Sequence, residues 1–308
     1  MVVGASSGAR ETQHQSRYLR RLAWDSTVLW ESDFPAHHDV ESLADGRLLT
    51  LSSATRVIDD GGVSRRIIDE QIVLAGADGK LQEAYSLFDA FAATPGIAPA
   101  GLDRRTVPMD GTHALDAFHA NSVEWIDLPQ FAGQHPLYQT GNVLVSMRHQ
   151  NRIAVLDRVA KRLLWVWGDG VLDGQHSARM LANGNILVFD NALRTRRSRV
   201  LEVDPRTNQV VTEFSGDESF YFYTLGGGAS QRLPNGNTLV TETSKGHLFE
   251  VTPRGDLVWR FVNPVQDPQS PRRATIHASK WLPATYVVPI LAKNAVESAQ
   301  NVLAGDVR

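Results

Sequence analysis

Short runs in which apolar and polar residues alternate recur along most of the chain, and polar turn residues separate them. Alternation with a period of two is typical of β-strands that bury one face. Residues 176–214 and 228–261 show the same order of strand, tight turn, strand, turn and strand. In each unit an Asn-Gly-Asn turn joins the first strand to the second. Asn and Gly tolerate the positive φ angles of such turns. The pattern predicts a repeated antiparallel unit.

The repeat has the length of a propeller blade. Asn142, Asn185 and Asn237 hold the same turn position in three units, and they are 43 and 52 residues apart. A four-stranded blade takes roughly 40–50 residues. An earlier unit has the same layout, with strands expected within residues 38–50, 67–74 and 80–86. The spacing therefore predicts an all-β fold of the β-propeller class.

The two ends of the repeat region look like complementary halves of one more blade. Residues 18–30 resemble the outer strands of a blade, and residues 277–288 resemble an inner strand. Pairing between them would close the ring and remove exposed sheet edges. Five blades can be counted in this way. Residues 90–109 contain Pro, Ala and Gly and are expected to form a loop or short helix inserted between two blades.

Composition supports one well-packed domain. The chain has 308 residues, 42% of them hydrophobic, so it can bury a large core. We expect a single propeller over residues 16–289, with tails at 1–15 and 290–308. Its net charge of −3 and the lack of a basic stripe exclude a nucleic-acid partner. With no Cys, thiolate catalysis, disulfides and cysteine-ligated zinc are also excluded.

The first residues of the chain have no long apolar stretch, so we expect no membrane segment. As written, the sequence predicts a cytoplasmic protein. A periplasmic or extracellular location would follow if an export segment preceded it.

Histidines recur at one phase of the repeat. The first strand of every propeller blade lines the central axis, so residues at equivalent positions face one another there. His38, His176 and His277 each stand nine residues before the corresponding turn position, and His119 begins the remaining blade. A single buried His is often only a satisfied structural residue. Recurrence in four blades favours a shared functional site.

Two arginines and several acidic residues are expected near these histidines. Arg148 and Arg194 offer a planar fork of donors that suits sulfate or phosphate oxygens. His149 stands beside Arg148 and is expected at the far end of the second strand. Carboxylates that would orient imidazoles or bind a cation are Asp39, Glu41, Glu124, Asp190 and Glu242.

Several of these segments together resemble the arylsulfotransferase family of bacterial β-propellers. The resemblance runs from about Trp24 to Asn263. The segments that carry it are HHDVE at 37–41, HANSVE at 119–124, SMRHQN at 146–151, GQHSAR at 174–179, NGNILVFDN at 183–191 and QRLPNGNTLV at 231–240.

The resemblance implies a six-bladed propeller that moves a sulfuryl group from an aryl sulfate ester to a phenol. The reaction would need neither a nucleotide donor nor a metal, and a histidine would carry the group. His119 and His176 match essential family histidines, and Arg194 matches the essential Arg. The family histidine that becomes sulfated has no counterpart, and Gly228 stands where another blade would carry one.

The residue types fit this chemistry. A neutral imidazole can attack sulfur, Arg can hold the equatorial oxygens, and a second His can move the proton. We expect aryl sulfates and phenols as partners and no cofactor. Catalysis is assigned to His119, His176, His38 and Arg194, and substrate binding to Arg148, His149, His277 and Asn121.

Two other classes of function stay open. A hydrolase or lactonase-type propeller would use a cation held by carboxylates, or a zinc ion held by three histidines with an open position for water. A propeller that only binds a small ligand or a protein is the other alternative, because the sulfated family histidine has no match.

Overall fold

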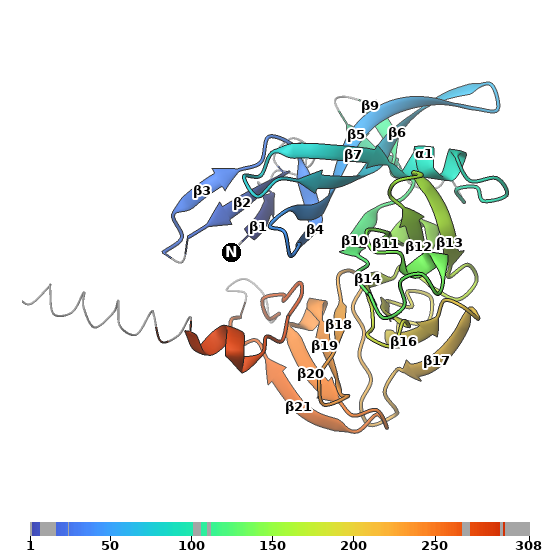
Figure 1. Cartoon of the computed structure of the whole chain (residues 1–308). Coiled ribbons are helices and arrows are strands. Elements are labelled where there is room, and N and C mark those ends of the chain that lie inside the picture. Colours follow the sequence, from blue (N-terminus) through green and yellow to red (C-terminus); the bar gives the residue numbers. More distant parts are fainter. Residues whose placement is uncertain are drawn as a thin grey trace, which may run out of the picture.

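Three successive parts of the chain each fold into a four-stranded antiparallel sheet whose strands follow one another in sequence order, and the part before them contributes four such strands to a six-stranded sheet (Figure 1). The computed structural model describes residues 2–6, 17–23, 25–100, 106–109, 112–266, 272–289 and 292. The first blade contains β4 (Ala36–Ser42), β5 (Leu48–Asp60), β6 (Val63–Ala75) and β7 (Leu81–Ser86). The second contains β10 (Ala120–Trp125), β11 (Val143–Met147), β12 (Arg152–Asp157) and β13 (Arg162–Trp167). The third contains β14 (His176–Met180), β15 (Ile186–Asp190), β16 (Arg199–Asp204) and β17 (Gln209–Phe214). The fourth contains β18 (Ala229–Arg232), β19 (Thr238–Glu242), β20 (His247–Val251) and β21 (Leu257–Val262).

The predicted Asn-Gly-Asn turns are present. In the third blade, Leu181 and Asn185 close the hairpin with a 2.7 Å backbone hydrogen bond, and Gly184 between them has φ = 86°. The fourth blade repeats this turn at Leu233 and Asn237. Because Gly has no Cβ, it takes this conformation without steric cost. The sequence prediction of these hairpins is confirmed.

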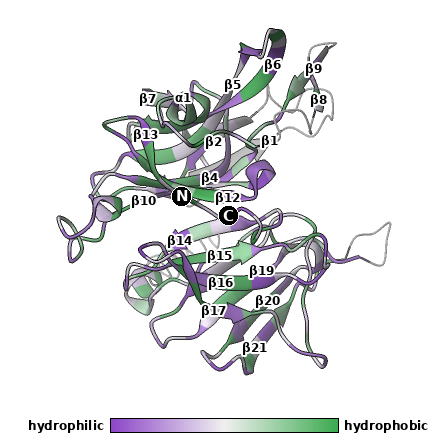
Figure 2. Cartoon of the chain, turned by 90° about the vertical axis from the view of Figure 1, so that its right-hand side faces the viewer, coloured by the Kyte–Doolittle hydropathy of each residue, from purple (hydrophilic) through white to green (hydrophobic). Residues whose placement is uncertain are grey.

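Hydrophobic cores lie between neighbouring blades. Every residue of β15 is buried, and Figure 2 shows apolar stretches on β15 and β16. Phe189 and Val200 of the third blade pack with Val240 and Phe249 of the fourth. Similar clusters join the first blade to the second and the second to the third. Apolar residues on both faces of the middle strands therefore hold the blades face to face, and this is the architecture of a β-propeller.

Inner strands of adjacent blades are joined by hydrogen bonds. β10 contacts both β4 and β14, and β14 contacts β18. At equivalent positions, a side-chain oxygen on one inner strand accepts a hydrogen bond from a backbone N–H of the next segment. These bonds join Glu41 to Trp125 (2.6 Å), Glu124 to Met180 (2.5 Å) and Gln231 to Trp281 (2.8 Å). The inner strands therefore gather side chains from distant parts of the sequence around one axis.

The expected pairing of the two ends of the chain is wrong. β2 (Arg17–Leu22) and β3 (Val28–Glu31) are strands as predicted, but β2 pairs with β1 (Val2–Ser6) in a three-stranded sheet. β1 therefore occupies the side of β2 that was expected to face the C-terminal segment. β1 lies within residues 1–15, which the sequence analysis assigned to a tail. The domain limits and the count of six blades stay predictions.

Residues 277–288 do not form the predicted strand. Residues 277–283 have no regular secondary structure, and residues 284–289 are helical. Pro283 gives a physical reason, because its ring removes a donor and it readily precedes or begins a helix. The position was nevertheless predicted well: the His277 carbonyl accepts from Thr243 Oγ1, and Ser279 Oγ lies 2.7 Å from Thr241 Oγ1. The segment runs beside the fourth blade where the next inner strand would lie.

The insertion after the first blade contains a short helix, but this helix begins before the predicted range of residues 90–109, and residues 106–109 form a strand rather than a loop. α1 (Leu87–Ala92) begins at Ser86, whose hydroxyl accepts from the backbone N–H of Asp89. The hairpin of β8 (Thr106–Met109) and β9 (Thr112–Leu115) follows and joins β6. Short 3-10 helices lie at η1 (Pro136–Tyr138), η2 (Arg148–Gln150) and η3 (Thr243–Lys245). No helix in the described ranges is long and apolar enough to cross a membrane.

Candidate functional site

Each of the four inner strands has a residue in the left-handed region at or near its start. These residues are His38 (φ = 59°), His119 (46°), Ser177 (51°) and Gly228 (102°). The register of the first three strands shifts at the same place, which marks a β-bulge. For a residue other than Gly this conformation costs roughly 1–2 kcal/mol, and such strain clusters at functional sites.

His119 is held by a buried carboxylate. Its Nδ1 lies 2.6 Å from Asp116 Oδ2, and its backbone N–H also donates to Asp116. Burial would raise the pKa of Asp116, but the hydrogen bond from His119 and the charges of His119 and His149 outweigh burial and lower it. Asp116 is therefore a carboxylate that accepts the Nδ1 proton. This fixes the lone pair of neutral His119 on Nε2.

His149 stacks on His119. The ring centroids are 4.4 Å apart, and the ring planes make an angle of 28°. Nδ1 of His149 donates to the Asp116 carbonyl oxygen at 2.7 Å. Two backbone hydrogen bonds join the segments that carry the rings, from Arg148 to His119 and from His149 to Phe118. The sequence analysis placed His149 at the end of β11, and the structure brings it into contact with His119.

His38 approaches His119 from the first blade. Its ring centroid lies 5.2 Å from that of His119. On its other side, His38 Nδ1 lies 2.7 Å from Nδ1 of His37, whose Nε2 lies 2.9 Å from Glu70 Oε2. Both His37 and Glu70 are buried. One of the two facing Nδ1 atoms donates to the other, so His37 orients His38.

His176 is neutral and fixed. Its Nδ1 donates to Asn191 Oδ1 at 2.7 Å, and its Nε2 accepts from the Gly227 N–H at 3.3 Å. Burial lowers the pKa of His176 to about 4, against the opposing effect of the Asn191 hydrogen bond. The charge of Arg148 lowers it further, as does that of His119 whenever His119 is protonated. His176 is therefore within electrostatic reach of the histidine cluster formed by His38, His119 and His149.

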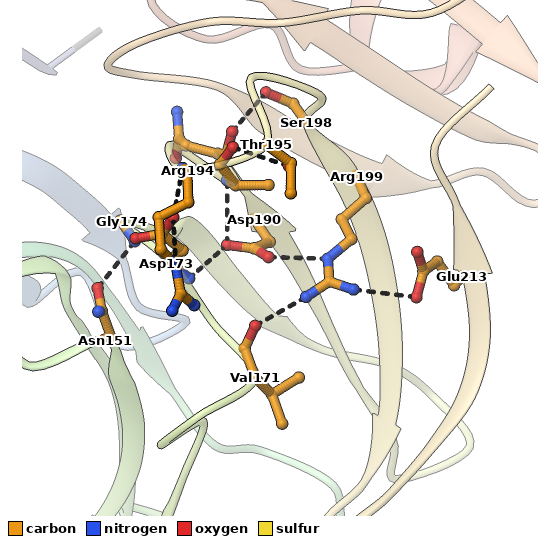
Figure 3. Close-up of polar contacts among 12 residues, drawn as sticks. Asn151, Val171, Asp173, Gly174, Asp190, Arg194, Thr195, Ser198, Arg199 and Glu213 are labelled. Atoms are coloured by element: carbon orange, nitrogen blue, oxygen red, sulfur yellow. Dashed lines mark hydrogen bonds and ion pairs between the residues drawn. The ribbon is translucent and has the colours of Figure 1, made fainter. Parts of the chain in front are cut away.

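The two predicted arginines have different surroundings. Arg148 is partly buried, and its Nη2 lies 3.5 Å from the Leu225 carbonyl oxygen. Arg194 has 73% of its side chain exposed, and its Nε lies 3.2 Å from Asp173 Oδ2 (Figure 3). Its backbone N–H donates to the same carboxylate. Of the two, Arg148 is the cation whose charge acts on His176.

Asn121 and His277 each make a hydrogen bond that joins neighbouring segments of the chain. Asn121 is buried, and its amide donates to the Gln175 carbonyl oxygen at 2.8 Å. This bond ties β10 to the residue before His176. The His277 residue is exposed, and its backbone carbonyl accepts from Thr243. Their predicted part in substrate binding stays a prediction.

A second layer of charges crosses the inner strands. Arg179 Nη2 lies 2.7 Å from Asp39 Oδ2, and the charges of Glu124 and Glu41 also act on this arginine. Burial raises the pKa of Glu124 to about 7, although Arg179 opposes the shift. The pKa of Glu41 is raised by burial too, and Lys280 is among the charges that lower it. Asp39, Glu41 and Glu124 were expected to orient imidazoles or bind a cation, and in the structure their charges act on Arg179.

Sequence reasoning missed the residues that orient the rings. Asp116 stands three residues before His119, and His37 directly precedes His38, so both were visible as neighbours. Glu70 is on β6 and gave no signal. Asn191 was part of a recognised segment without an assigned role. Long-range contacts of this kind follow from blade packing rather than from local sequence.

Blades packed side by side, with His38, His119 and His149 in contact near the starts of the inner strands, define a propeller with a histidine cluster. A family model described as arylsulfotransferase (ASST) matches residues 19–264. The chain therefore belongs to the arylsulfotransferase family. A comparison with curated proteins found no match.

Solved structures give more distant similarities. A protein of unknown function from Bacteroides caccae is 16% identical over 85% of this chain and 72% of that chain, with a TM-score of 0.45. The Dos1 propeller is 14% identical over 86% of this chain and 56% of that chain, with a TM-score of 0.48. Virginiamycin B lyase from Staphylococcus aureus is 12% identical over 85% and 68%, with a TM-score of 0.44. This chain thus spans little more than half the length of the Dos1 propeller chain.

Proposed function

We propose that this protein transfers a sulfuryl group from an aryl sulfate ester to a phenol, with His119 as the nucleophile. Membership of the arylsulfotransferase family supports the reaction class. The observation that carries the assignment is the 2.6 Å contact between His119 Nδ1 and the Asp116 carboxylate. A carboxylate at Nδ1 orients the ring and raises the electron density at Nε2.

Transfer proceeds in two displacements. Nε2 of His119 attacks sulfur, so an N–S bond forms while the S–O bond to the phenolate leaving group breaks. His38, in its imidazolium form, gives a proton to that phenolate and becomes neutral, which suits a ring 5.2 Å from His119. The acceptor phenol then attacks the sulfur of the sulfohistidine, the N–S bond breaks, and His38 takes the phenol proton.

The remaining residues bind the substrates. Arg148 carries the positive charge that balances the sulfuryl oxygens. His176 is neutral, and its Nε2 would accept a hydrogen bond from the acceptor hydroxyl in place of the one from the Gly227 N–H. Arg194 would contribute by exchanging Asp173 for a substrate oxygen. His149 supports His119 by stacking.

The direct test uses the full chain, 4-nitrophenyl sulfate and an added phenol. We expect release of nitrophenolate that depends on the phenol, and a peptide of the donor-treated protein in which His119 carries one sulfuryl group by mass spectrometry. His119→Ala should abolish both signals. His135→Ala, at an exposed residue outside the cluster, is the matched control and should retain both.

Three results would contradict the proposal. Label on another histidine would reject His119 as the nucleophile. Phenol-dependent transfer that persists in His119→Ala would do the same. Release of nitrophenolate to water alone, lost on chelation of metal ions, would favour the metal-dependent hydrolase.

A further inference from the structure

One group of residues has the composition of a metal site. In the part of the chain that the structure describes, one set of three His or acidic residues offers ligand atoms that all lie within 4.8 Å of one another: Asp116, His119 and His149. These residues come from the segment before β10 and from η2 after β11. Asp116 and His149 are largely buried, with side-chain exposures of 8% and 9%.

From this geometry we propose that Asp116, His119 and His149 bind a divalent transition-metal ion of the zinc type. We further propose that the bound ion inhibits sulfuryl transfer, and this second part rests on the function proposed above. The first part requires only the three side chains.

The donor set selects the class of metal. Two imidazole nitrogens and one carboxylate oxygen form a set that is common in zinc sites with an open position. Neutral imidazole suits zinc, copper, nickel and iron, whereas calcium and magnesium prefer oxygen ligands throughout. We therefore expect Zn²⁺ and Co²⁺ to bind, and Ca²⁺ and Mg²⁺ to bind far more weakly.

The site is held in place before any ion enters. The backbone hydrogen bonds from Arg148 to His119 and from His149 to Phe118 fix the distance between the two segments. The Asp116 carbonyl oxygen holds Nδ1 of His149, which is the usual way in which a metal-binding histidine is oriented. Preorganisation of this kind lowers the entropy cost of binding.

Metal binding and catalysis would compete for the same groups. A metal on Nε2 of His119 would occupy the lone pair that attacks sulfur, and a metal on Nδ1 would replace the hydrogen bond to Asp116 that orients the ring. Because the three residues lie within one hydrogen-bonded unit, one ion would block the nucleophile and its partner together. Zinc should therefore act as an inhibitor rather than as a cofactor.

The binding test uses full-length protein that has been treated with a chelator and titrated with Co²⁺. We expect a visible absorption band that saturates at one ion per chain and is displaced by Zn²⁺. Asp116→Ala and His149→Ala should each weaken binding at least about tenfold, in keeping with the loss of a ligand. His135→Ala and Asp127→Ala, at exposed residues outside the cluster, are matched controls and should bind as the unchanged protein does.

Two outcomes would overturn the binding site. One is a lack of saturable Co²⁺ binding, and the other is binding that neither variant weakens. Folding of each variant is checked by its unfolding transition, and two independent variants keep the test valid if one fails to fold. Activity plays no part in this measurement, so it stands even if the protein does not transfer sulfuryl groups.

The inhibition test compares metal-free and Zn²⁺-loaded protein with 4-nitrophenyl sulfate and a phenol. We expect loss of transfer on Zn²⁺ addition and recovery with a chelator. His149→Ala, measured against its own metal-free rate, should need at least about tenfold more Zn²⁺ for the same loss. Transfer that Zn²⁺ leaves unchanged, or transfer that requires the ion, would overturn inhibition. A protein inactive in both forms would count against the proposed function, whereas the Co²⁺ titration would still decide the site.

Discussion

The ring of Phe189 fills the space that a side chain at Gly228 would need. A Cβ at position 228 would lie 2.3 Å from Cε1 of Phe189, far inside van der Waals contact. Gly228 also has φ = 102°, where other residues are strained. The inner strand of the fourth blade therefore begins with a glycine for a packing reason. The histidine expected there from the family resemblance has no room, which is why the proposed nucleophile is His119.

Gly228→Ala should destabilise the fold strongly. The substitution combines backbone strain with overpacking against a fully buried phenylalanine, for a total loss of about 2–4 kcal/mol in the free energy of unfolding. Denaturant unfolding measures it. Gly170→Ala is the matched control, because Gly170 also has a positive φ but meets no atom within 4 Å of its Cβ. That variant should lose only about 1 kcal/mol. Equal losses in the two variants would show that the Phe189 ring moves aside without any loss in the free energy of unfolding.

Asp116→Asn should impair catalysis more than binding. An amide oxygen can accept the Nδ1 proton of His119, but it carries no negative charge to strengthen the nucleophile. We expect kcat for phenol-dependent transfer to fall by roughly 10²–10⁴, with KM within a few-fold of its original value. Steady-state kinetics with 4-nitrophenyl sulfate measures both constants. A rise in KM at constant kcat would instead assign Asp116 to substrate binding.

Glu124→Gln should stabilise the protein at alkaline pH. Burial raises the pKa of Glu124 from its ordinary 4.5 to about 7, so the folded state holds a proton that the unfolded state has lost between these values. The stability that this group contributes is complete below about pH 4.5 and is lost as pH rises through about 7. Gln stays neutral, so the variant should gain up to about 3 kcal/mol at pH 8 and nothing near pH 4.

The control for this experiment is Glu218→Gln, which removes the same charge at an exposed residue. It separates the local effect from the change in net charge. Unfolding in urea at pH 4, 6 and 8 provides the three comparisons. A difference between wild type and Glu124→Gln that does not change with pH would contradict the raised pKa.

The blades could be predicted from sequence because their information is local. Alternating strands and Asn-Gly-Asn turns each specify a hairpin within a few residues, and β14 to β21 follow that reading. Residues 277–288 show the limit, because an apolar run near Pro283 fits a strand or a helix equally well by pattern. Phase along the repeat also brought His38, His119 and His176 to the inner strands, although bulges shift their register.

The partners of the histidines could not be predicted in the same way. Glu70 reaches His37 across the first blade, and Asn191 reaches His176 from the far end of β15. Such contacts depend on how the strands twist and where a bulge falls, which residue spacing does not encode. For Arg194 the prediction came from a motif match alone. The match placed Arg194 near the histidines, whereas its side chain pairs with Asp173.

His176 should make the fold less stable in acid. Burial lowers the pKa of His176 from 6.5 to about 4, so between these values the unfolded chain binds a proton that the folded protein does not. Stability from this group is present above about pH 6.5 and is lost as pH falls towards 4, a change of about 3 kcal/mol. In His176→Gln this part of the pH dependence disappears. The difference between the two proteins at pH 8, where the imidazole is neutral in both states, measures the change in packing alone. We therefore expect the unfolding free energies of wild type and variant to converge, or to cross, as pH is lowered from 7 to 4. Parallel curves over that range would mean that His176 takes up its proton in the folded protein as readily as in the unfolded chain.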